Sequence, residues 1–282
     1  MQFKAITERT YKKTSYCFVI LYIINYLHLK FKIMAQQKGI LKIEGTMGGM
    51  TFYKKDGQYL VKEKSSISAD KIANDPNFAR TRENNTEFGL AGSTGKFLRD
   101  ALRSMMLDAS DTYVTSRVTQ LMKNELNLDT TSIRGSRQPS IGLATAEGKA
   151  LLNGFNFNAN SVLSSVLYKA FAVDPATGVI TINNLVPQKD IAYPSGATHF
   201  SINGGMADID FVNGVSDLQI TNEENLPIDL TSNALVLTPV ALPVGTGIKV
   251  HLLKVEFFQL MNGIQYPLKN GAYNSLAIVS VE

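Results

Sequence analysis

The sequence predicts an α+β protein with an N-terminal three-strand β-meander, a helical middle and a C-terminal antiparallel β-sandwich. Three observations lead to this prediction. Residues 39–64 alternate between apolar and polar side chains around glycine-containing turns. Residues 81–127 place apolar side chains three and four positions apart, as on one face of a helix. From about residue 153 the period changes to two, in short runs separated by Gly, Pro and Asn.

The composition is that of a folded protein. Of the 282 residues, 44% are hydrophobic and 18% are charged, which is enough apolar surface to build cores and too much for general disorder. We expect three segments: a leader or over-extended start at residues 1–33, a β-meander with helices at 34–150, and a β-sandwich domain at 151–282. The last segment is long enough to hold its own core.

The net charge of +4 is unevenly distributed along the chain. Residues 1–33 carry six basic and one acidic side chain, residues 34–150 carry 17 and 13, and residues 151–282 carry 5 and 10. Binding to nucleic acid through phosphate contacts needs clustered cations, and the C-terminal half lacks them. The opposite signs of the two halves favour either head-to-tail contact between copies or an ordinary solvated surface.

The first 33 residues combine Lys12 and Lys13 with an apolar run at residues 16–24. The run resembles a signal peptide without a clear cleavage site, and it is shorter than the roughly 20 apolar residues of a spanning helix. Three interpretations stay open: a true start at Met34, an export or anchoring segment, and a buried helix. A start at Met34 implies a cytoplasmic protein, and membrane contact is expected only if residues 1–33 are translated. The single cysteine, Cys17, also lies here, so the rest of the chain can form no disulfide.

The meander is expected as strands at residues 40–44, 50–54 and 58–64, with turns at residues 46–49 and 55–57. Three strands without a packing partner are marginally stable. We therefore expect this segment to pack on its own chain or on a neighbour, and its edge strands are suited to extend another sheet.

The middle of the chain predicts a helix at residues 81–107, a second from Asp111 or Thr112 to Asn127, and a weaker one at residues 144–152. Residues 128–142 are expected to form a polar loop. The C-terminal half should begin with a hairpin of residues 166–173 and 179–182. Further strands are predicted at residues 198–202, 207–211, 216–221, 234–239, 248–260, 264–268 and 276–281.

One face of the strand at residues 248–260 is expected to be exposed to solvent. Polar side chains interrupt its apolar pattern, which is typical of an antiparallel strand with one wet face. These side chains are Lys249, His251, Lys254 and Glu256.

Three stretches carry a resemblance to known proteins. They are residues 38–40 with 45–54, residues 77–84, and the strand-and-turn residues 255–259 with 266–272. Through them the chain resembles a family of uncharacterised proteins from Bacteroidetes-type bacteria, over most of residues 34–282. Members of this family look as though they start near Met34. The resemblance implies a shared fold, and it carries over no functional residue.

The segment from Gly92 to Lys96 has the small residues of a phosphate-binding loop but not its pattern. Leu90 stands where the first glycine of that motif belongs, and Phe97 stands where Ser or Thr should bind magnesium. No strong strand precedes the segment. We expect its small residues to allow close packing of helices.

Histidines and carboxylates offer weak candidate sites. His199 or His251 could join Ser195 or Ser201 in a nucleophilic site only if the fold brought them together, and a surface or hydrogen-bonded strand histidine is the favoured interpretation. Calcium would require carboxylates at loop spacing, and a glycosidase would require a carboxylate pair in a cleft. A solvated strand face is favoured for the acidic residues, which are Asp208, Asp210, Asp217, Glu223 and Glu224.

A small basic stripe of Lys96, Arg99 and Arg103 is possible at helical spacing, near Arg80 and Arg82. Acidic side chains lie between these cations, so we expect a salt-bridged solvent face in place of a nucleic-acid site. No cofactor or metal is expected, and the chain is not expected to be an enzyme.

The sequence therefore predicts a structural or interaction protein that acts by self-assembly or by binding a protein partner. A component of a phage-like or surface particle would fit this role. The alternative is a carbohydrate- or ligand-binding β-sandwich module, which would expose aromatic side chains on one face. The candidate partner-binding residues are Phe52, Tyr53, Tyr59, Phe257, Phe258 and Tyr266.

Overall fold

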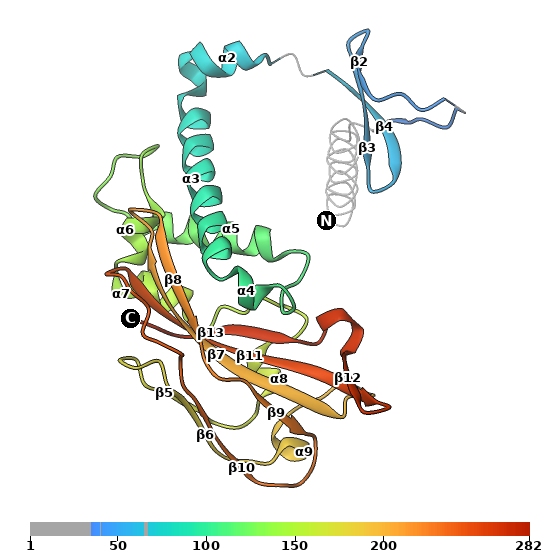
Figure 1. Cartoon of the computed structure of the whole chain (residues 1–282). Coiled ribbons are helices and arrows are strands. Elements are labelled where there is room, and N and C mark those ends of the chain that lie inside the picture. Colours follow the sequence, from blue (N-terminus) through green and yellow to red (C-terminus); the bar gives the residue numbers. More distant parts are fainter. Residues whose placement is uncertain (1–34, 40, 65–66) are drawn as a thin grey trace, which may run out of the picture. The chain divides into compact units, whose positions relative to one another are not determined.

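The structure is a computed structural model that describes residues 35–39, 41–64 and 67–282 (Figure 1). The chain divides into two units, Met1–Ile72 and Ala73–Glu282, and each is described by itself. The expectations for residues 1–33 and for a start at Met34 lie outside the described residues.

In its described part, the first unit forms a four-stranded antiparallel sheet in the order β1-β4-β3-β2. The predicted pairing of the second and third meander strands is confirmed by β3 and β4. The hairpins turn at Gly48-Gly49 and Asp56-Gly57, where positive φ angles allow tight turns between antiparallel strands. The strands are β1 (Ala35–Gln36), β2 (Gly45–Met47), β3 (Met50–Lys55) and β4 (Gln58–Glu63).

The strand predicted at residues 40–44 is wrong in its described part, because residues 41–44 form no strand. The side-chain amide of Gln37 takes up both backbone hydrogen bonds of Ile43. Its Nε2 donates to the carbonyl oxygen of Ile43 at 3.1 Å, and its Oε1 accepts from the N–H of Ile43 at 3.0 Å. The strand that pairs with β3 is β2, and β1 adds an edge strand that was not predicted.

The helical middle of the chain is confirmed. Helices α3 (Ala79–Ala101) and α4 (Arg103–Met106) replace the one helix expected at residues 81–107. Gly95 lets α3 approach α5 (Val114–Asn127) closely, since a Cβ at this position would lie only 3.1 Å from Cγ1 of Val118 on α5. The segment from Gly92 to Lys96 thus lies inside α3 and forms no loop. The other helices here are α2 (Ala69–Asn74), η1 (Pro76–Phe78), α6 (Pro139–Leu143) and α7 (Ala146–Leu152).

The polar loop predicted at residues 128–142 is wrong in its last part, where helix α6 begins at Pro139. Pro139 occupies the first turn of α6, where its missing N–H costs nothing and its fixed φ suits a helix. At the start of α5, the Asp111 carboxylate accepts a hydrogen bond from the N–H of Tyr113 at 2.7 Å. The helix start expected at Asp111 or Thr112 is wrong, because Tyr113 is the residue that caps α5 and the helix begins at Val114.

Two antiparallel sheets follow in the C-terminal half. The predicted pairing of the first hairpin is confirmed by β5 (Ala172–Val173) and β6 (Ile180–Leu185). Its first strand is much shorter than the expected 166–173, because residues 166–171 belong to no named strand and Val166 ends helix α8 (Leu163–Val166). The smaller sheet has the order β10-β6-β5, with β10 at Asn233–Leu237. The larger sheet holds β7 (His199–Asp210), β8 (Val215–Ile220), β9 (Glu224–Pro227), β11 (Ile248–Met261), β12 (Ile264–Pro267) and β13 (Ser275–Val281). Helix α9 (Pro187–Asp190) and η2 (Leu268–Gly271) connect strands.

The two strands expected at residues 198–202 and 207–211 are one continuous strand, β7. Gly204 and Gly205 lie between the two expected strands without interrupting β7, and they serve packing on opposite faces of the sheet. A Cβ at Gly204 would lie 2.9 Å from Cδ1 of Ile180, and one at Gly205 would lie 2.6 Å from Sδ of Met105. The glycines therefore let the smaller sheet and helix-side side chains approach the strand closely.

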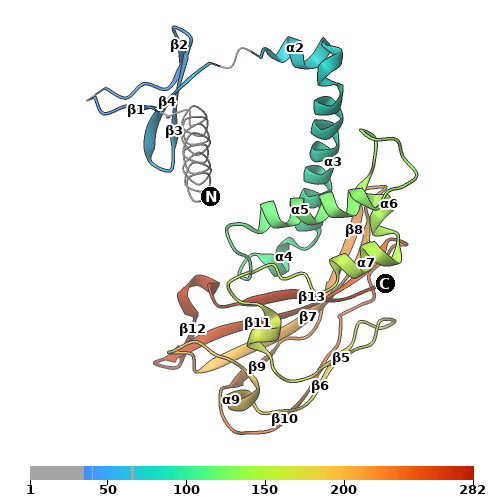
Figure 2. The same cartoon turned by 180° about the vertical axis from the view of Figure 1, so that it is seen from behind.

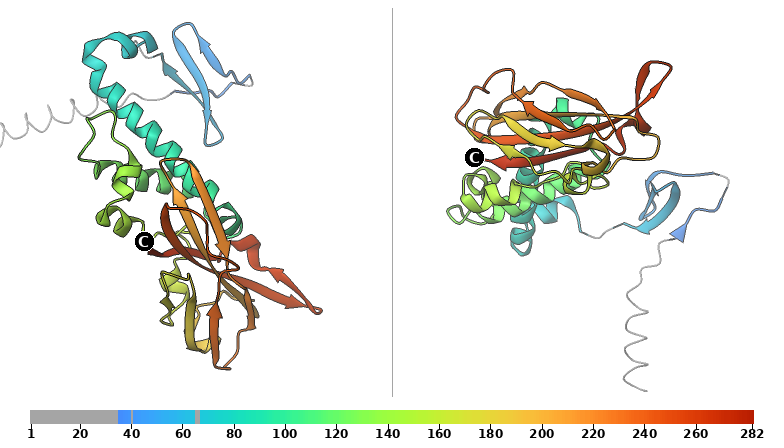
Figure 3. Two further views of the ribbon diagram at one scale, coloured as in Figure 1. Left: turned by 60° about the vertical axis from the view of Figure 1, so that its left-hand side comes forward. Right: turned by 90° about the horizontal axis from the view of Figure 1, so that it is seen from below.

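The larger sheet is covered on both faces, as Figures 2 and 3 show. Helices α3, α5 and α7 share one core with Ala207, Val250 and Leu276 of the sheet. The smaller sheet shares the other core with Phe200 and Phe257. The larger sheet is thus packed against a second sheet on one face and against helices on the other. The helices and the larger sheet share a core, so the chain does not divide at the boundary expected near residue 150. The division falls between Ile72 and Ala73 along the sequence.

The wet face expected for the strand at residues 248–260 is wrong. Both faces of β11 are covered, and successive side chains on it face the two cores in turn. His251 and Lys254 are therefore buried on opposite faces. The Lys254 ammonium forms an ion pair with the Glu256 carboxylate at 2.9 Å, which neutralises its charge in the core.

Candidate functional site

The N-terminal sheet has one apolar face, which follows from the register of its strands. Side chains directly opposite each other on antiparallel strands point to the same face. Phe52 pairs with Gly45 on β2 and with Val61 on β4, and Ala35 pairs with Val61 on its other side. We call this set the middle row of the apolar face.

Two further rows flank the middle row on the same face, two residues away along each strand. One end row holds Met47, Met50 and Glu63, and the other holds Lys54 and Tyr59. The Lys54 ammonium lies 5.3 Å from the centre of the Tyr59 ring, which confirms that these two side chains share a face. One end of the apolar face is therefore acidic and the other basic.

Within the described part of the first unit, the apolar face is uncovered. Met47 is 62% exposed and Met50 is 51% exposed. None of the described residues from 35 to 72 is buried, and Phe52 and Tyr59 are half-buried. A sheet of this size with an apolar face needs a covering surface to be stable.

The structure separates the three aromatic residues predicted in this sheet. Phe52 and Tyr59 lie on the apolar face, in adjacent rows. Tyr53 pairs with Leu60 and lies on the opposite, more polar face, where the Lys62 ammonium is 5.4 Å from its ring. The prediction missed the contribution of Met47, Met50 and Val61, and the alternation Met50-Thr51-Phe52 was the signal for it.

The three aromatic residues predicted near the C-terminus do not form one surface. Phe257 is only 1% exposed and belongs to the core between the two sheets, so it cannot contact a partner. Phe258, next on β11, points to the other face and is half-buried. Tyr266 on β12 pairs with Gln259 and is 50% exposed. Of these three residues, Tyr266 alone offers the exposed ring that the sandwich alternative required.

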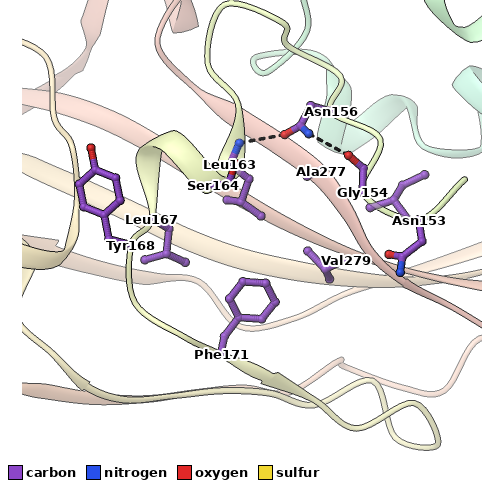
Figure 4. A pocket seen from close by; sticks show the side chains of 11 residues that line it. Asn153, Gly154, Asn156, Leu163, Ser164, Leu167, Tyr168, Phe171, Ala277 and Val279 are labelled. Atoms are coloured by element: carbon purple, nitrogen blue, oxygen red, sulfur yellow. Dashed lines mark hydrogen bonds between the residues drawn. The ribbon is translucent and has the colours of Figure 1, made fainter. Parts of the chain in front are cut away.

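The second unit contains a pocket of about 560 Å³ that the sequence did not indicate (Figure 4). It lies between α8 and the segment that follows it on one side and β13 on the other. Its lining is mainly apolar, with Leu163, Leu167, Phe171 and Val279, and Tyr168 is exposed at its edge. The Asn156 amide is already used, because its Nδ2 donates to the Gly154 carbonyl oxygen and its Oδ1 accepts from the Leu163 N–H.

The structure brings together neither a nucleophilic triad nor a metal site among the residues it describes. The His199 ring bonds to its neighbour Thr198 at 3.0 Å, and Ser201 accepts a hydrogen bond from Asn225. His251 is fully buried, and burial lowers the pKa of its ring. Throughout the described ranges, no three His, Cys, Asp or Glu side chains converge as metal ligands would.

The acidic residues of the larger sheet serve local structure. Asp208 and Asp217 face each other across β7 and β8. The Asp208 carboxylate accepts a hydrogen bond from the N–H of Gly247 at 2.8 Å, and Asp217 accepts one from Val244 at 2.8 Å. Both therefore fix the loop that leads into β11. Asp210 accepts hydrogen bonds within the turn after β7, including one from the Asn213 N–H at 2.9 Å.

The expected basic stripe on α3 is partly paired with acids. Arg80 bonds to Glu83 at 2.7 Å, and Lys96 lies 3.9 Å from Asp100, each about one helical turn away. Both are the exposed pairs of a solvated helix face.

Two buried carboxyl groups near α5 have opposite environments. Glu87 on α3 accepts two hydrogen bonds at 2.7 Å from the Arg137 guanidinium, which lowers the pKa of the carboxyl to about 2. Glu125 on α5 is fully buried, neither of its carboxyl oxygens has a hydrogen-bond partner, and burial raises its pKa to about 8. Neither group lines the pocket of Figure 4.

Comparison with protein-family models, with curated proteins and with solved structures finds no match for this chain. The resemblance inferred from the sequence therefore stays a prediction. Within the described ranges, no helix is both long and apolar enough to cross a membrane.

Proposed function

We propose that this chain is a structural or interaction protein that acts by self-assembly or by binding a protein partner through the apolar face of its N-terminal sheet. One observation carries the proposal: the described part of this sheet has an ordered apolar face and no buried residue. An apolar patch that its own sheet leaves uncovered is typical of an interaction surface. Repeated copies joined in this way would suit a component of a phage-like or surface particle.

The edges of the same sheet support the proposal. In the described residues, β2 pairs with β3 alone and β1 pairs with β4 alone. Each of these short edge strands is positioned to accept a further strand. Face and edge together give a partner both apolar contact and backbone hydrogen bonds.

The test compares two substitutions on neighbouring residues of β3 in the full chain. Phe52→Ser removes the ring at the centre of the apolar face, whereas Tyr53→Ser removes a ring from the opposite face. Light scattering over a range of concentrations, with negative-stain microscopy, should show an assembly that Phe52→Ser abolishes and Tyr53→Ser preserves. A chain that stays monomeric, and whose partner binding is the same in both variants, would contradict the proposal.

A second candidate function rests on the pocket of Figure 4. We propose as the alternative a carbohydrate- or ligand-binding module, because an apolar pocket with an exposed tyrosine at its edge is a common form of small-molecule site. Glycan-array binding or a thermal shift with a ligand library should be lost in Tyr168→Ala and kept in Tyr266→Ala. The opposite result would place the site at β12.

A further inference from the structure

The charges at the two ends of the apolar face are arranged so that the face is complementary to itself. The acidic end row holds Glu63 beside Met47 and Met50, and the basic end row holds Lys54 beside Tyr59. The Lys42 ammonium lies 5.7 Å from the centre of the Tyr59 ring, which adds a second cation to the basic end. Four residues along a strand separate the two end rows by about 13 Å.

Two copies of this face can stack in two symmetric ways. A two-fold axis across the strands, through the middle row, reverses the strand direction and lays each acidic row over the basic row of the other copy. A two-fold axis along the strands lays acidic row near acidic row and basic row near basic row. The first arrangement is favoured because like charges in one interface oppose association.

The same two-fold axis also brings the apolar side chains of the two copies into contact. It places Phe52 of one copy against Phe52 of the other, at a spacing of about 10 Å between packed sheets, which aromatic side chains can fill. Met50 of each copy then lies over Lys54 of the other on β3, and Glu63 lies over Tyr59 on β4, with Lys54 on the neighbouring strand within reach of the Glu63 carboxylate. The middle row, with Phe52 and Val61 already half-buried, thus becomes the core of a small sandwich of two sheets.

We infer that the partner of the N-terminal sheet is a second copy of this chain, bound face to face with its strands antiparallel, so that Glu63 of each copy meets Lys54 of the other. This inference rests on the proposed function and names its partner. The contact is isologous, so each copy contributes the same surface and the pair of Glu63 and Lys54 occurs twice.

Charge reversal tests the inference in the full chain by sedimentation or light scattering over a range of concentrations. Lys54→Glu and Glu63→Lys should each weaken self-association by about tenfold or more, because each places like charges at both copies of the pair. An equimolar mixture of the two variants should restore association to about the wild-type level, since every pair in the mixed dimer is again attractive.

Lys55→Glu is the matched control. Lys55 neighbours Lys54 on β3 and is also exposed, but it pairs with Gln58 and lies on the opposite face. Its reversal changes the net charge equally and should leave self-association unchanged. The mixing experiment separates true pairing of the two residues from a general effect of net charge.

The outcomes separate this inference from the function on which it rests. Wild-type association that neither reversal weakens, or a mixture that associates no better than its components, would overturn the face-to-face pairing and leave self-assembly through another surface. A monomeric wild-type chain that binds a different protein only when Phe52 is present would overturn the second copy as partner and keep the interaction surface. If Phe52→Ser changes neither self-association nor partner binding, the proposed function is wrong as well.

Discussion

The carboxyl group of Glu125 lies against the backbone of Gly148. A Cβ placed at Gly148 would be 2.5 Å from Oε2 of Glu125 and 2.2 Å from the carbonyl oxygen of Gly142. Helices α5, α6 and α7 thus meet around a fully buried acid whose oxygens have no hydrogen-bond partner. Gly142 and Gly148 lack the Cβ atoms that would block this close approach. Because the enclosed group is an acid, the stability of this packing depends on pH.

Glu125→Gln should make the protein more resistant to alkaline conditions. Burial raises the pKa of Glu125 from 4.5 to about 8, so the folded state holds this proton more tightly than the unfolded chain. The stability contributed by the neutral acid is present below pH 4.5 and is lost as the pH rises to about 8. We expect urea unfolding at pH 9 to show the variant about 2–5 kcal/mol more stable than wild type, with a small difference at pH 4.5.

The control for this prediction is Glu147→Gln. Glu147 is an exposed carboxylate beside Gly148 on α7, so its replacement removes the same charge without removing a buried acid. Its stability relative to wild type should vary little with pH. A difference between Glu125→Gln and wild type that stays constant from pH 4.5 to pH 9 would show that Glu125 titrates normally in the folded protein.

Gly148→Ala should destabilise the second unit by about 3 kcal/mol or more. The added methyl group meets backbone as well as the Glu125 side chain, and backbone cannot move aside cheaply. Gly92→Ala on α3 is the matched control, because nothing lies within 4 Å of its added Cβ. That change should be neutral or stabilising by about 0.5–1 kcal/mol, as expected for alanine in a helix. Equal effects of the two substitutions in thermal unfolding would refute this packing account.

Arg137→Met should destabilise the helical layer by about 3–5 kcal/mol near pH 7. The substitution leaves the Glu87 carboxylate buried without its guanidinium partner, so the pKa of this acid should rise from about 2. The destabilisation should therefore shrink as the pH is lowered and Glu87 becomes protonated. Arg134→Met, which removes a half-exposed guanidinium 3.5 Å from Glu83, should cost less than about 1 kcal/mol.

Asn274→Ala should cost about 2–3 kcal/mol, because the buried Asn274 amide joins two segments far apart in the sequence. Its Oδ1 accepts a hydrogen bond from the N–H of Phe257 at 3.1 Å, and its Nδ2 donates to the carbonyl oxygen of Asp108 at 2.9 Å. Asn160→Ala, at an exposed side chain, should change the free energy of unfolding little. A similar result for both variants in chemical denaturation would mean that solvent replaces these bonds.

Local chemistry made much of the fold predictable. The turns at Gly48-Gly49 and Asp56-Gly57 follow from glycine and aspartate at positions that need positive φ. Helices α3 and α5 follow from their apolar spacing. The errors came from long-range packing. Gly204 and Gly205 fall between the two strands expected at residues 198–202 and 207–211, but the side chains that pack on these glycines come from distant segments. The side-chain pattern of residues 41–44 favours a strand, but in the structure the amide of Gln37 binds the backbone of Ile43.

The candidate site was predictable only in part, for the same reason. Strand alternation places Phe52 on one face and Tyr53 on the other, but sequence alone does not tell which face a partner covers. Phe257 was chosen as an exposed aromatic because the cover over its face, the smaller sheet, comes from other parts of the chain. Glu125 did carry a signal, since it lies three positions after Met122 and seven after Val118, on the buried side of α5.

Strands β7 and β11 run through the middle of the larger sheet and pair with each other from Ile248 opposite Ile209 to Phe258 opposite His199. Each strand contributes side chains to both cores, so neither the helical layer nor the smaller sheet can detach without disturbing the backbone that supports the other. The second unit should therefore melt in one cooperative transition. Its amide hydrogens between β7 and β11 should be the slowest to exchange with deuterated solvent, at the free energy of global unfolding.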